Sequence, residues 1–256
     1  MGISGQMQTK SGKDRLIVAL DVPTQDEAVD LVKKLDNVFI FKIGLGLILN
    51  GSVAAVLAEL QKNRSESGGI FIDLKVGWDI GNTITNFVKV CTELRIKFIT
   101  VSGPPEFTIN SGVIQTALDA RVGDYPKILG VPLLSDASID ETTLSGASTD
   151  TEYILQRGGE LLTAGCDGLI VSGKPIHDCK QKFPGKIIVS PGIRPLGTTA
   201  DGHLRLTTPS QAIELGSDYL VVGRPILNAS DRKAAAQKII DEIDEALDCR
   251  HSPVSL

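Results

Sequence analysis

The stretch Ile70-Phe71-Ile72-Asp73-Leu74-Lys75 is an apolar run that ends in charge, and apolar residues at helical spacing follow it over Ile80–Leu94. This pattern predicts a buried strand followed by a helix. Side chains two residues apart on a strand point to the same face, so Asp73 and Lys75 are predicted to lie side by side at the carboxyl end of the strand.

The same alternation of strand and helix extends outward over the whole chain. Helix signals include a capping box of Thr24 and Glu27 before Ala28–Leu35, the Ala- and Leu-rich Ser52–Gln61, and Ser230 as the cap of an amphipathic Asp231–Leu247. The predicted strands are Leu16–Asp21, Val38–Ile43, Ile70–Lys75, Lys97–Ser102, Ile128–Leu133, Gly168–Ser172, Lys186–Ser190 and Tyr219–Val222.

Eight such units, each of about 30 residues, predict an α/β protein with a closed (β/α)8 TIM barrel in a single domain. A doubly wound open sheet is the alternative, but no G-x-G-x-x-G follows the first strand and no Gly-Lys pair is followed by Ser or Thr. We expect a flexible N-terminal segment over 1–13, the catalytic barrel over 14–248 and a C-terminal tail over 249–256.

Composition limits the classes of partner. The net charge is −5 and the 256 residues include 7 Phe, 3 Tyr and 1 Trp, which argues against a nucleic-acid surface. Four cysteines without a C-x-x-C pair predict reduced thiols, and three histidines without ligand spacing argue against a metal site. No membrane-spanning run or signal peptide is recognisable, so we expect a cytoplasmic protein with no membrane partner.

Charged residues gather at the predicted carboxyl ends of the first three strands, where barrel enzymes carry their chemistry. Asp21 ends the first strand, Lys42 lies near the end of the second, and Asp73 and Lys75 end the third. A solvated strand-end charge is the ordinary interpretation of Asp21 alone. Because isolated buried charges are costly, the set as a whole predicts a cluster of alternating charge.

A second group of residues follows strands seven and eight. Pro191-Gly192-Ile193-Arg194 closes the seventh strand, and Gly223-Arg224-Pro225 closes the eighth. Barrels commonly hold phosphate at this position, and the planar guanidinium of Arg224 matches phosphate oxygens. A surface arginine behind a turn glycine is the alternative. Together the two groups predict a phosphorylated small molecule that lies across the barrel mouth with its reactive part over Lys75.

At this point the sequence resembles the orotidine 5′-phosphate decarboxylase family over nearly all of Arg15–Ile240. Each matching piece is modest by itself, but their order and their placement at strand ends make the resemblance specific. The pieces are Ala19-Leu20-Asp21-Val22, Lys42-Ile43-Gly44-Leu45, Asp73-Leu74-Lys75, Asp79-Ile80-Gly81-Asn82-Thr83, Pro191-Gly192-Ile193-Arg194-Pro195 and Asp218-Tyr219-Leu220-Val221-Val222-Gly223-Arg224-Pro225-Ile226.

The resemblance implies decarboxylation of orotidine 5′-phosphate to UMP and CO₂, the last step of de novo pyrimidine nucleotide synthesis, without cofactor or metal and in a homodimer. It implies that Lys75 protonates C6 of the pyrimidine, that Asp73 lies against the substrate carboxylate, and that Lys42 binds ribose and orders the network. Asp79 and Thr83 would reach the neighbouring subunit's site. The other implied substrate contacts are Asp21, Ile80, Ser135, Pro191, Arg194, His203, Gly223 and Arg224.

The chain departs from the family pattern at identifiable positions. The family spaces its motif D-x-K-x-x-D, whereas Val76-Gly77-Trp78 here places one extra residue before Asp79. The fourth strand ends in Val101-Ser102-Gly103 where the family has a histidine after Val, and His203 aligns with a lid glutamine. Ser135-Asp136 aligns with a Thr-Ser pair. The extra residue changes the spacing between Lys75 and Asp79, so it affects whether Asp79 can take the role that the family motif implies for it.

Two other functions remain open from the sequence. A sister branch of the superfamily uses the same Asp-x-Lys strand with magnesium on sugar phosphates, but it needs a carboxylate after strand two, where Gly44-Leu45-Gly46-Leu47 offers none. A catalytically silent binder of nucleotide phosphates is the second. An acyl-transfer hydrolase is disfavoured because no G-x-S-x-G motif occurs.

Overall fold

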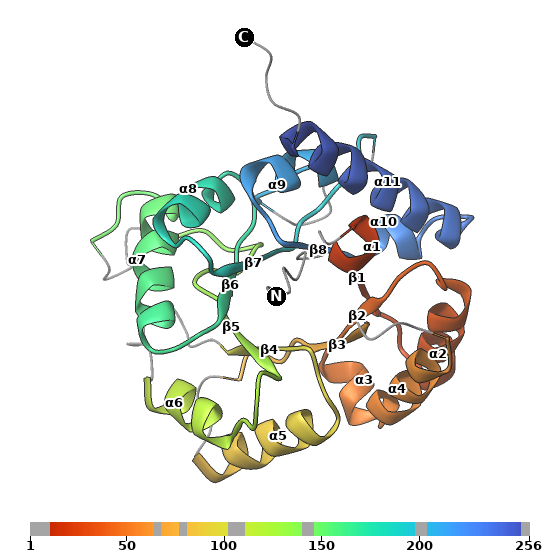
Figure 1. Ribbon diagram of the computed structural model, residues 1–256, viewed down its shortest axis with the longest axis horizontal. Coiled ribbons are helices and arrows are strands. Elements are labelled where there is room, and N and C mark those ends of the chain that lie inside the picture. The colour runs from red at the N-terminus through yellow and green to blue at the C-terminus, as the bar shows by residue number, and fades with distance from the viewer. Residues whose placement is uncertain are drawn as a thin grey trace, which may run out of the picture.

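Eight parallel strands close into a barrel in chain order, which confirms the predicted (β/α)8 fold (Figure 1). The computed structural model describes residues 11–63, 68–76, 81–101, 111–139, 146–197 and 204–251. The first and last strands pair with each other and complete the ring. The strands are β1 Leu16–Ala19, β2 Ile40–Ile43, β3 Gly69–Ile72, β4 Phe98–Val101, β5 Lys127–Gly130, β6 Gly168–Ile170, β7 Ile187–Ser190 and β8 Tyr219–Val222.

Helices surround the barrel on the outside, as Figure 1 shows. From the first strand to the seventh, each is followed by a helical segment that returns the chain to the amino end of the next strand, and this connection keeps all strands parallel. The helices are α1 Gly12–Arg15, α2 Gln25–Lys34, α3 Leu45–Leu49, α4 Ser52–Asn63, α5 Gly81–Glu93, α6 Ser111–Ala120, α7 Asp150–Thr163, α8 Pro175–Lys182, α9 Pro209–Leu215, α10 Arg224–Leu227 and α11 Arg232–His251.

Alternate strand residues fill the inside of the barrel. The aromatic rings of Phe71, Phe98 and Tyr219 meet edge to face there, with centroids 5.9 Å apart for the first pair and 5.0 Å for the second. All three are buried together with Ile17, Ile40, Leu129 and Val189. The interior is therefore a packed core, and it forms a floor beneath the carboxyl ends of the strands.

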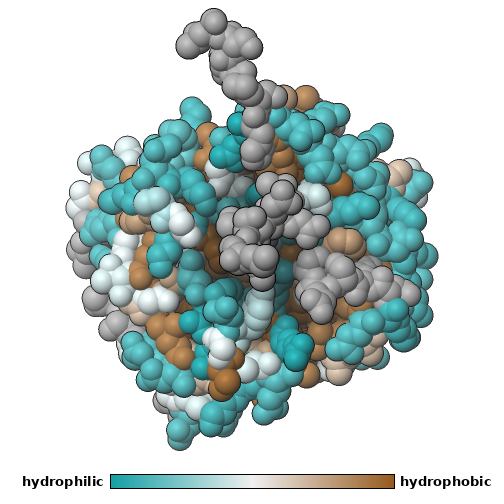
Figure 2. All heavy atoms as spheres, viewed as in Figure 1, coloured by the Kyte–Doolittle hydropathy of each residue, from teal (hydrophilic) through white to brown (hydrophobic). Residues whose placement is uncertain are grey.

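A second apolar layer lies between the strands and the helices. In α2, for example, Ala28, Leu31 and Val32 are buried, while Lys34 remains in solvent and pairs with Asp30 one turn earlier. Figure 2 shows hydrophilic residues over much of the periphery, with smaller hydrophobic areas between them. This two-sided pattern is the one expected of helices that cover a sheet.

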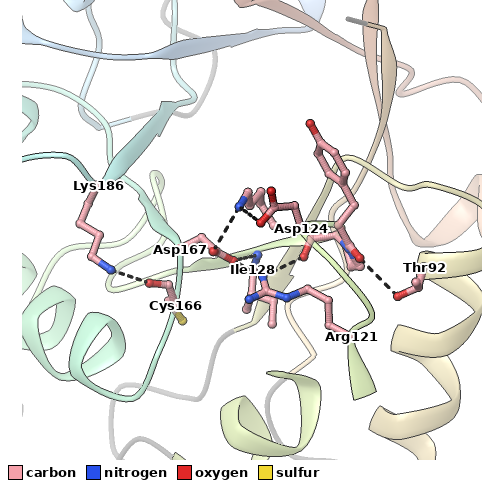
Figure 3. A network of polar contacts seen from close by, with 10 residues as sticks. Thr92, Arg121, Asp124, Ile128, Cys166, Asp167 and Lys186 are labelled. Carbon is pink, nitrogen blue, oxygen red and sulfur yellow. Dashed lines mark hydrogen bonds and ion pairs between the residues drawn. The ribbon is translucent and has the colours of Figure 1, made fainter. Parts of the chain in front are cut away.

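Polar contacts fasten the amino ends of neighbouring strands (Figure 3). Asp167, one residue before β6, accepts hydrogen bonds from the backbone N–H of Ile128 in β5 at 2.8 Å and from Arg121 at 2.6 Å. Lys127 approaches the same carboxylate at 3.8 Å. This cluster joins β5, β6 and the end of α6 on the side of the barrel away from the strands' carboxyl ends.

The boundaries of several elements differ from those predicted. β1 and β3 end at Ala19 and Ile72, so Asp21, Asp73 and Lys75 lie just beyond the strands. The last helix is capped by Asp231, whose carboxylate accepts from the N–H of Ala234 at 2.9 Å, which makes the assignment of Ser230 wrong. Since α1 begins at Gly12 and α11 ends at His251, helices extend slightly into both predicted terminal segments. No helix in the described ranges is long and apolar enough to cross a membrane.

Candidate active site

A pocket of about 820 Å³, part of it open to solvent, lies at the carboxyl ends of the strands. Because all strands are parallel, these ends meet around one opening, and residues far apart in sequence share the pocket. Most of the predicted site residues line it. The lining residues are Ala19, Asp21, Lys42, Phe71, Asp73, Lys75, Val131, Leu133, Leu134, Ser135, Ile170, Pro191, Gly192, Arg194, Val221, Gly223 and Arg224.

Four charged groups form a chain of alternating sign across one side of the pocket. The Nζ atom of Lys75 lies 2.9 Å from Oδ1 of Asp73, and Nζ of Lys42 lies 3.6 Å from Oδ2 of the same carboxylate. Lys42 also lies 3.5 Å from Oδ1 of Asp21. These distances confirm the predicted cluster. Asp73 is held from both sides by cations, whereas Asp21 is open to solvent.

Lys75 reaches Asp73 by a route that the sequence did not predict. Its backbone has φ of +52°, in the left-handed region, so Lys75 does not continue the strand. The prediction that the two side chains lie side by side was correct, but strand alternation is not the reason. A non-glycine residue in this region is strained, and such strain is typical of functional sites.

The environment of Asp73 keeps its carboxylate ionised. Burial by itself raises the pKa of Asp73, but the charges of Lys42 and Lys75 and hydrogen bonds from Lys75 and Thr100 outweigh this effect, so the pKa lies below its ordinary value. Both lysines line the pocket, and the side chain of Lys75 is 38% exposed, compared with 14% for Lys42. Lys75 is therefore the cation of the pair that is better placed to meet a ligand.

Sequence reasoning missed Thr100. Its hydroxyl donates to Oδ1 of Asp73 at 2.9 Å and accepts from the backbone N–H of Lys75 at 2.9 Å. The expectation for strand four concerned Val101-Ser102-Gly103, of which Ser102 and Gly103 lie outside the described residues. Thr100 was recognisable as the polar residue within the otherwise apolar run Phe98–Val101, two positions after an inward-facing phenylalanine.

The opposite side of the pocket combines glycines with arginines, as expected for an anion site. Gly192, with φ of +76°, turns the chain after β7, and Arg194 follows with its side chain largely buried. A Cβ on Gly223 would lie 3.4 Å from Oδ2 of Asp21, so this glycine leaves room between β8 and β1. Arg224 begins α10 and is exposed at the pocket.

An apolar wall connects the two ends of the pocket. Val131 and Leu133, which follow β5 in the chain, are buried, and Leu134 and Ser135 come next at the rim of the pocket. The carbonyl of Ser135 accepts from the N–H of Leu204 at 3.2 Å, which joins the segment after β5 to the segment after β7. The wall gives the pocket an apolar side, with Ser135 as a polar residue at its edge.

Four of the predicted site residues are not among the described residues that line the pocket. Asp79, Ile80 and His203 lie outside the described residues. Thr83 is exposed on α5 and lies outside the set of described residues that line the pocket. In the described ranges no group of three or more His, Cys, Asp or Glu side chains could hold a metal ion. The carboxylates that line the pocket there, Asp21 and Asp73, both face Lys42.

The barrel and its pocket define a class: a (β/α)8 enzyme with a lysine–aspartate centre at one side of the site and a group of glycines and arginines at the other. The model of the "Orotidine 5'-phosphate decarboxylase / HUMPS family" matches residues 14–239. The chain belongs to this family.

Individual relatives agree with the family match. The chain is 36% identical over 235 residues to an orotidine 5'-phosphate decarboxylase of Ruegeria pomeroyi, covering 90% of this chain and 94% of the relative. It is 37% identical over 236 residues to one of Afipia carboxidovorans, covering 90% and 95%. The crystal structure of the Lactobacillus acidophilus orotidine 5'-phosphate decarboxylase superposes with a TM-score of 0.72 at 31% identity, covering 90% of this chain and 99% of that chain.

Proposed function

We propose that the pocket decarboxylates orotidine 5′-phosphate to UMP and CO₂, with Lys75 as the group that protonates C6 of the pyrimidine. The observation that carries this assignment is the alternating array of Asp21, Lys42, Asp73 and Lys75 beneath a pocket whose far side carries Arg194 and Arg224. The reaction is the final step of UMP synthesis and belongs to pyrimidine biosynthesis.

The chemistry explains why an ammonium group is needed. Loss of CO₂ from C6 leaves an electron pair that the pyrimidine ring does not delocalise, so the barrier is high, and enzymes lower barriers by about 8–23 kcal/mol. A fixed cation beside C6 stabilises charge that develops in the transition state. The C–C bond to the carboxylate breaks, its electrons remain on C6, and a proton moves from Nζ of Lys75 to C6.

Asp73 supports this role in two ways. Its ionised carboxylate holds Nζ of Lys75 in place at 2.9 Å. It would also lie against the substrate carboxylate, and removal of CO₂ relieves that repulsion. Contacts of the distant phosphate with Gly223, Arg194 and Arg224 offset the unfavourable placement of the two carboxylates. Pro191, Ser135 and the apolar wall hold the base, and Asp21 and Lys42 bind the ribose.

A magnesium-dependent reaction on a sugar phosphate is the competing function. That chemistry needs a second carboxylate beside the one after strand three, and the chain has Gly44 at the position after β2. Asp73 is already flanked by two ammonium groups, which repel a divalent cation. The donor set therefore favours the metal-free decarboxylation.

The active unit is a homodimer in which Asp79 and Thr83 complete the partner's site. Thr83 is exposed on α5 instead of lining its own chain's pocket. Leu45 and Leu49 on α3, which follows β2 at the pocket end, are 60% and 79% exposed, and apolar surface of this kind is typical of subunit contacts. His203, which lies outside the described residues, is a further substrate contact in this proposal.

The compartment is the cytoplasm. Cys91, Cys166 and Cys179 are buried as free thiols, and burial raises the pKa of each to about 12, so they remain unreactive. Cys249 is exposed and also free. Reduced cysteines are the usual state in a reducing compartment.

Turnover tests the proposal directly. Purified protein is mixed with orotidine 5′-phosphate in excess EDTA, and loss of the orotate chromophore is followed. We expect turnover by the native protein and its loss in Lys75→Ala, with UMP binding retained in the variant. Loss of activity in EDTA with recovery on added magnesium would favour the sugar-phosphate branch, and UMP binding without turnover would identify a silent binder.

Subunit complementation tests the shared site. Lys75→Ala and Asp79→Ala homodimers are each expected to be inactive. A mixed dimer has one site carrying both changes and one site that is native, so mixing the two variants should restore activity. Continued inactivity of mixtures that are shown to exchange subunits would contradict the shared site.

A further inference from the structure

Thr100 lies between the two residues that the proposed reaction uses most directly. It is 1% exposed and is the third residue of β4, one strand away from the Asp73 segment. The register pairs Phe71 with Phe98 and Ile72 with Ile99, so Asp73, which directly follows β3, comes opposite Thr100 of β4. The hydroxyl is thus placed in the layer directly above the edge-to-face phenylalanine pair.

One hydroxyl makes two different hydrogen bonds at this point. It donates to Oδ1 of Asp73 at 2.9 Å, and it accepts from the backbone N–H of Lys75 at 2.9 Å. A hydroxyl has one donor and two acceptor positions, so both bonds form at once. The main chain adds a third link, since the N–H of Val76 donates to the carbonyl of Thr100 at 3.2 Å.

These bonds act on the two features that make the centre unusual. The bond to Lys75 lies at the residue whose backbone is left-handed, a conformation that a lysine adopts only when its surroundings impose it. The bond to Asp73 fixes the rotation of the carboxylate, so that Oδ1 faces Lys75 and Oδ2 faces Lys42. A single group from β4 therefore sets both the position of the cation and the orientation of its anion.

We propose that Thr100 is a positioning residue for the decarboxylation: its hydroxyl holds the backbone of Lys75 and the carboxylate of Asp73 in the arrangement that places Nζ at C6. This inference rests on the proposed function. The assignment predicts an effect on the chemical step and little effect on substrate binding. The reason is that Arg194 and Arg224, the proposed contacts of the substrate phosphate, lie at the other side of the pocket.

The test compares variants that separate the hydroxyl from the shape of the side chain. Thr100→Val keeps the volume and removes the hydroxyl, whereas Thr100→Ser keeps the hydroxyl. Loss of a hydrogen bond to a charged group corresponds to a decrease of about 10- to 100-fold, and we expect that decrease in kcat for Thr100→Val, with KM and the dissociation constant of UMP within about threefold of native. Thr100→Ser is expected to recover most of kcat.

Ile99→Val is the matched control. Ile99 is the preceding residue of β4, is fully buried, and belongs to the layer between the strands and the helices. The Ile99→Val variant loses packing on the same strand without a change at the charged centre, so the kcat of this variant should equal that of the native protein. Thermal unfolding of each variant separates folding defects from effects on catalysis, and Thr100→Ala against Thr100→Ser repeats the comparison if the valine variant does not fold.

The outcomes are distinguishable from a failure of the proposed function. If the native protein does not decarboxylate orotidine 5′-phosphate, the function fails before Thr100 is considered. If the native protein is active, a native kcat in folded Thr100→Val overturns the inference. Equal impairment of Thr100→Val and Thr100→Ser overturns it as well, because the hydroxyl would then not be the cause.

Discussion

Asp167 and Asp218 occupy equivalent positions in two different units of the barrel. Each lies one residue before a strand, and each carboxylate accepts a hydrogen bond of 2.8 Å from the second residue of the preceding strand, Ile128 in β5 or Ile188 in β7. The backbone N–H of each aspartate in turn donates to the carbonyl of that same residue at 2.8 Å. A cation completes each site, Arg121 at 2.6 Å or Lys180 at 2.7 Å.

Removing the charge of Asp167 should therefore lower stability without changing catalysis. Asp167→Asn weakens hydrogen bonds that involve charged groups, which contribute about 1.5–3 kcal/mol, so we expect a loss of about 2 kcal/mol in the free energy of unfolding. Urea unfolding and kcat/KM are the two measurements. Asp124→Asn is the control, because Asp124 is 86% exposed and its pair with Lys127 is worth less than about 1 kcal/mol. Equal effects of the two changes would contradict the assignment.

Stability should fall on acidification because of Asp73 and Asp150. Burial raises the pKa of Asp150, but hydrogen bonds from Ile139 and Ser138 and the charge of Arg205 outweigh this effect. The pKa of Asp150, like that of Asp73, therefore lies below its ordinary value. As pH falls, these two carboxylates therefore take up protons in the unfolded chain before they do so in the folded protein. The stabilisation is present above the unfolded pKa of about 4 and is lost as pH falls through the folded pKa.

Unfolding in urea at a series of pH values from about pH 7 to about pH 3 tests this dependence. The free energy of unfolding should decrease toward the acidic end, and the decrease should be shallower in Asp150→Asn, which lacks one of the two carboxylates. A steeper decrease in the variant would contradict the sign.

Arg224 should contribute mainly to substrate binding. Removal of a charged hydrogen-bonding partner costs about 1.5–3 kcal/mol, so Arg224→Ala is expected to lower kcat/KM for orotidine 5′-phosphate by about 10- to 100-fold. Arg224→Lys keeps the charge but not the planar fork, and should recover part of the loss. The nucleoside orotidine, which lacks the phosphate, is the control substrate. An equal loss with orotidine would show that Arg224 does not act through the phosphate.

Arg205 should hold two walls of the pocket together. Its guanidinium donates to Asp150 at the start of α7 at 2.8 Å, to the carbonyl of Ala137 at 2.6 Å, and to the carbonyl of Leu134, a residue of the apolar wall. Because Arg205 itself lies between β7 and α9, these bonds join two loops at the pocket rim. Arg205→Ala is expected to raise KM by about tenfold, through loss of interactions with charged groups.

A double-mutant cycle measures the pair itself. Arg205→Ala, Asp150→Asn and the double variant should show a coupling of about 0.5–3 kcal/mol in urea unfolding, as residues in contact do. Additive effects of the two changes would show that Arg205 acts through the carbonyls of Leu134 and Ala137 instead of through Asp150.

The sequence was sufficient for the barrel and for most of the site. The strands are short and mostly apolar, and Asp21, Lys42 and Asp73 each stand at or next to the end of an apolar run, so the closure of parallel strands brings these three residues together. The spacing of apolar residues, and the position of a charged residue relative to them, are local properties of the sequence. They are legible in the sequence because every residue that carries them is close to its own strand.

Tertiary structure alone determined how the centre is held. Lys75 leaves the strand direction with a left-handed backbone, and its N–H finds the hydroxyl of Thr100 on a different strand. Arg205 likewise joins segments that are far apart in the chain. Such contacts depend on the register between β3 and β4 and on the approach of loops across the rim. Local propensity carries no information on either, because both distances are set only when the ring of strands closes.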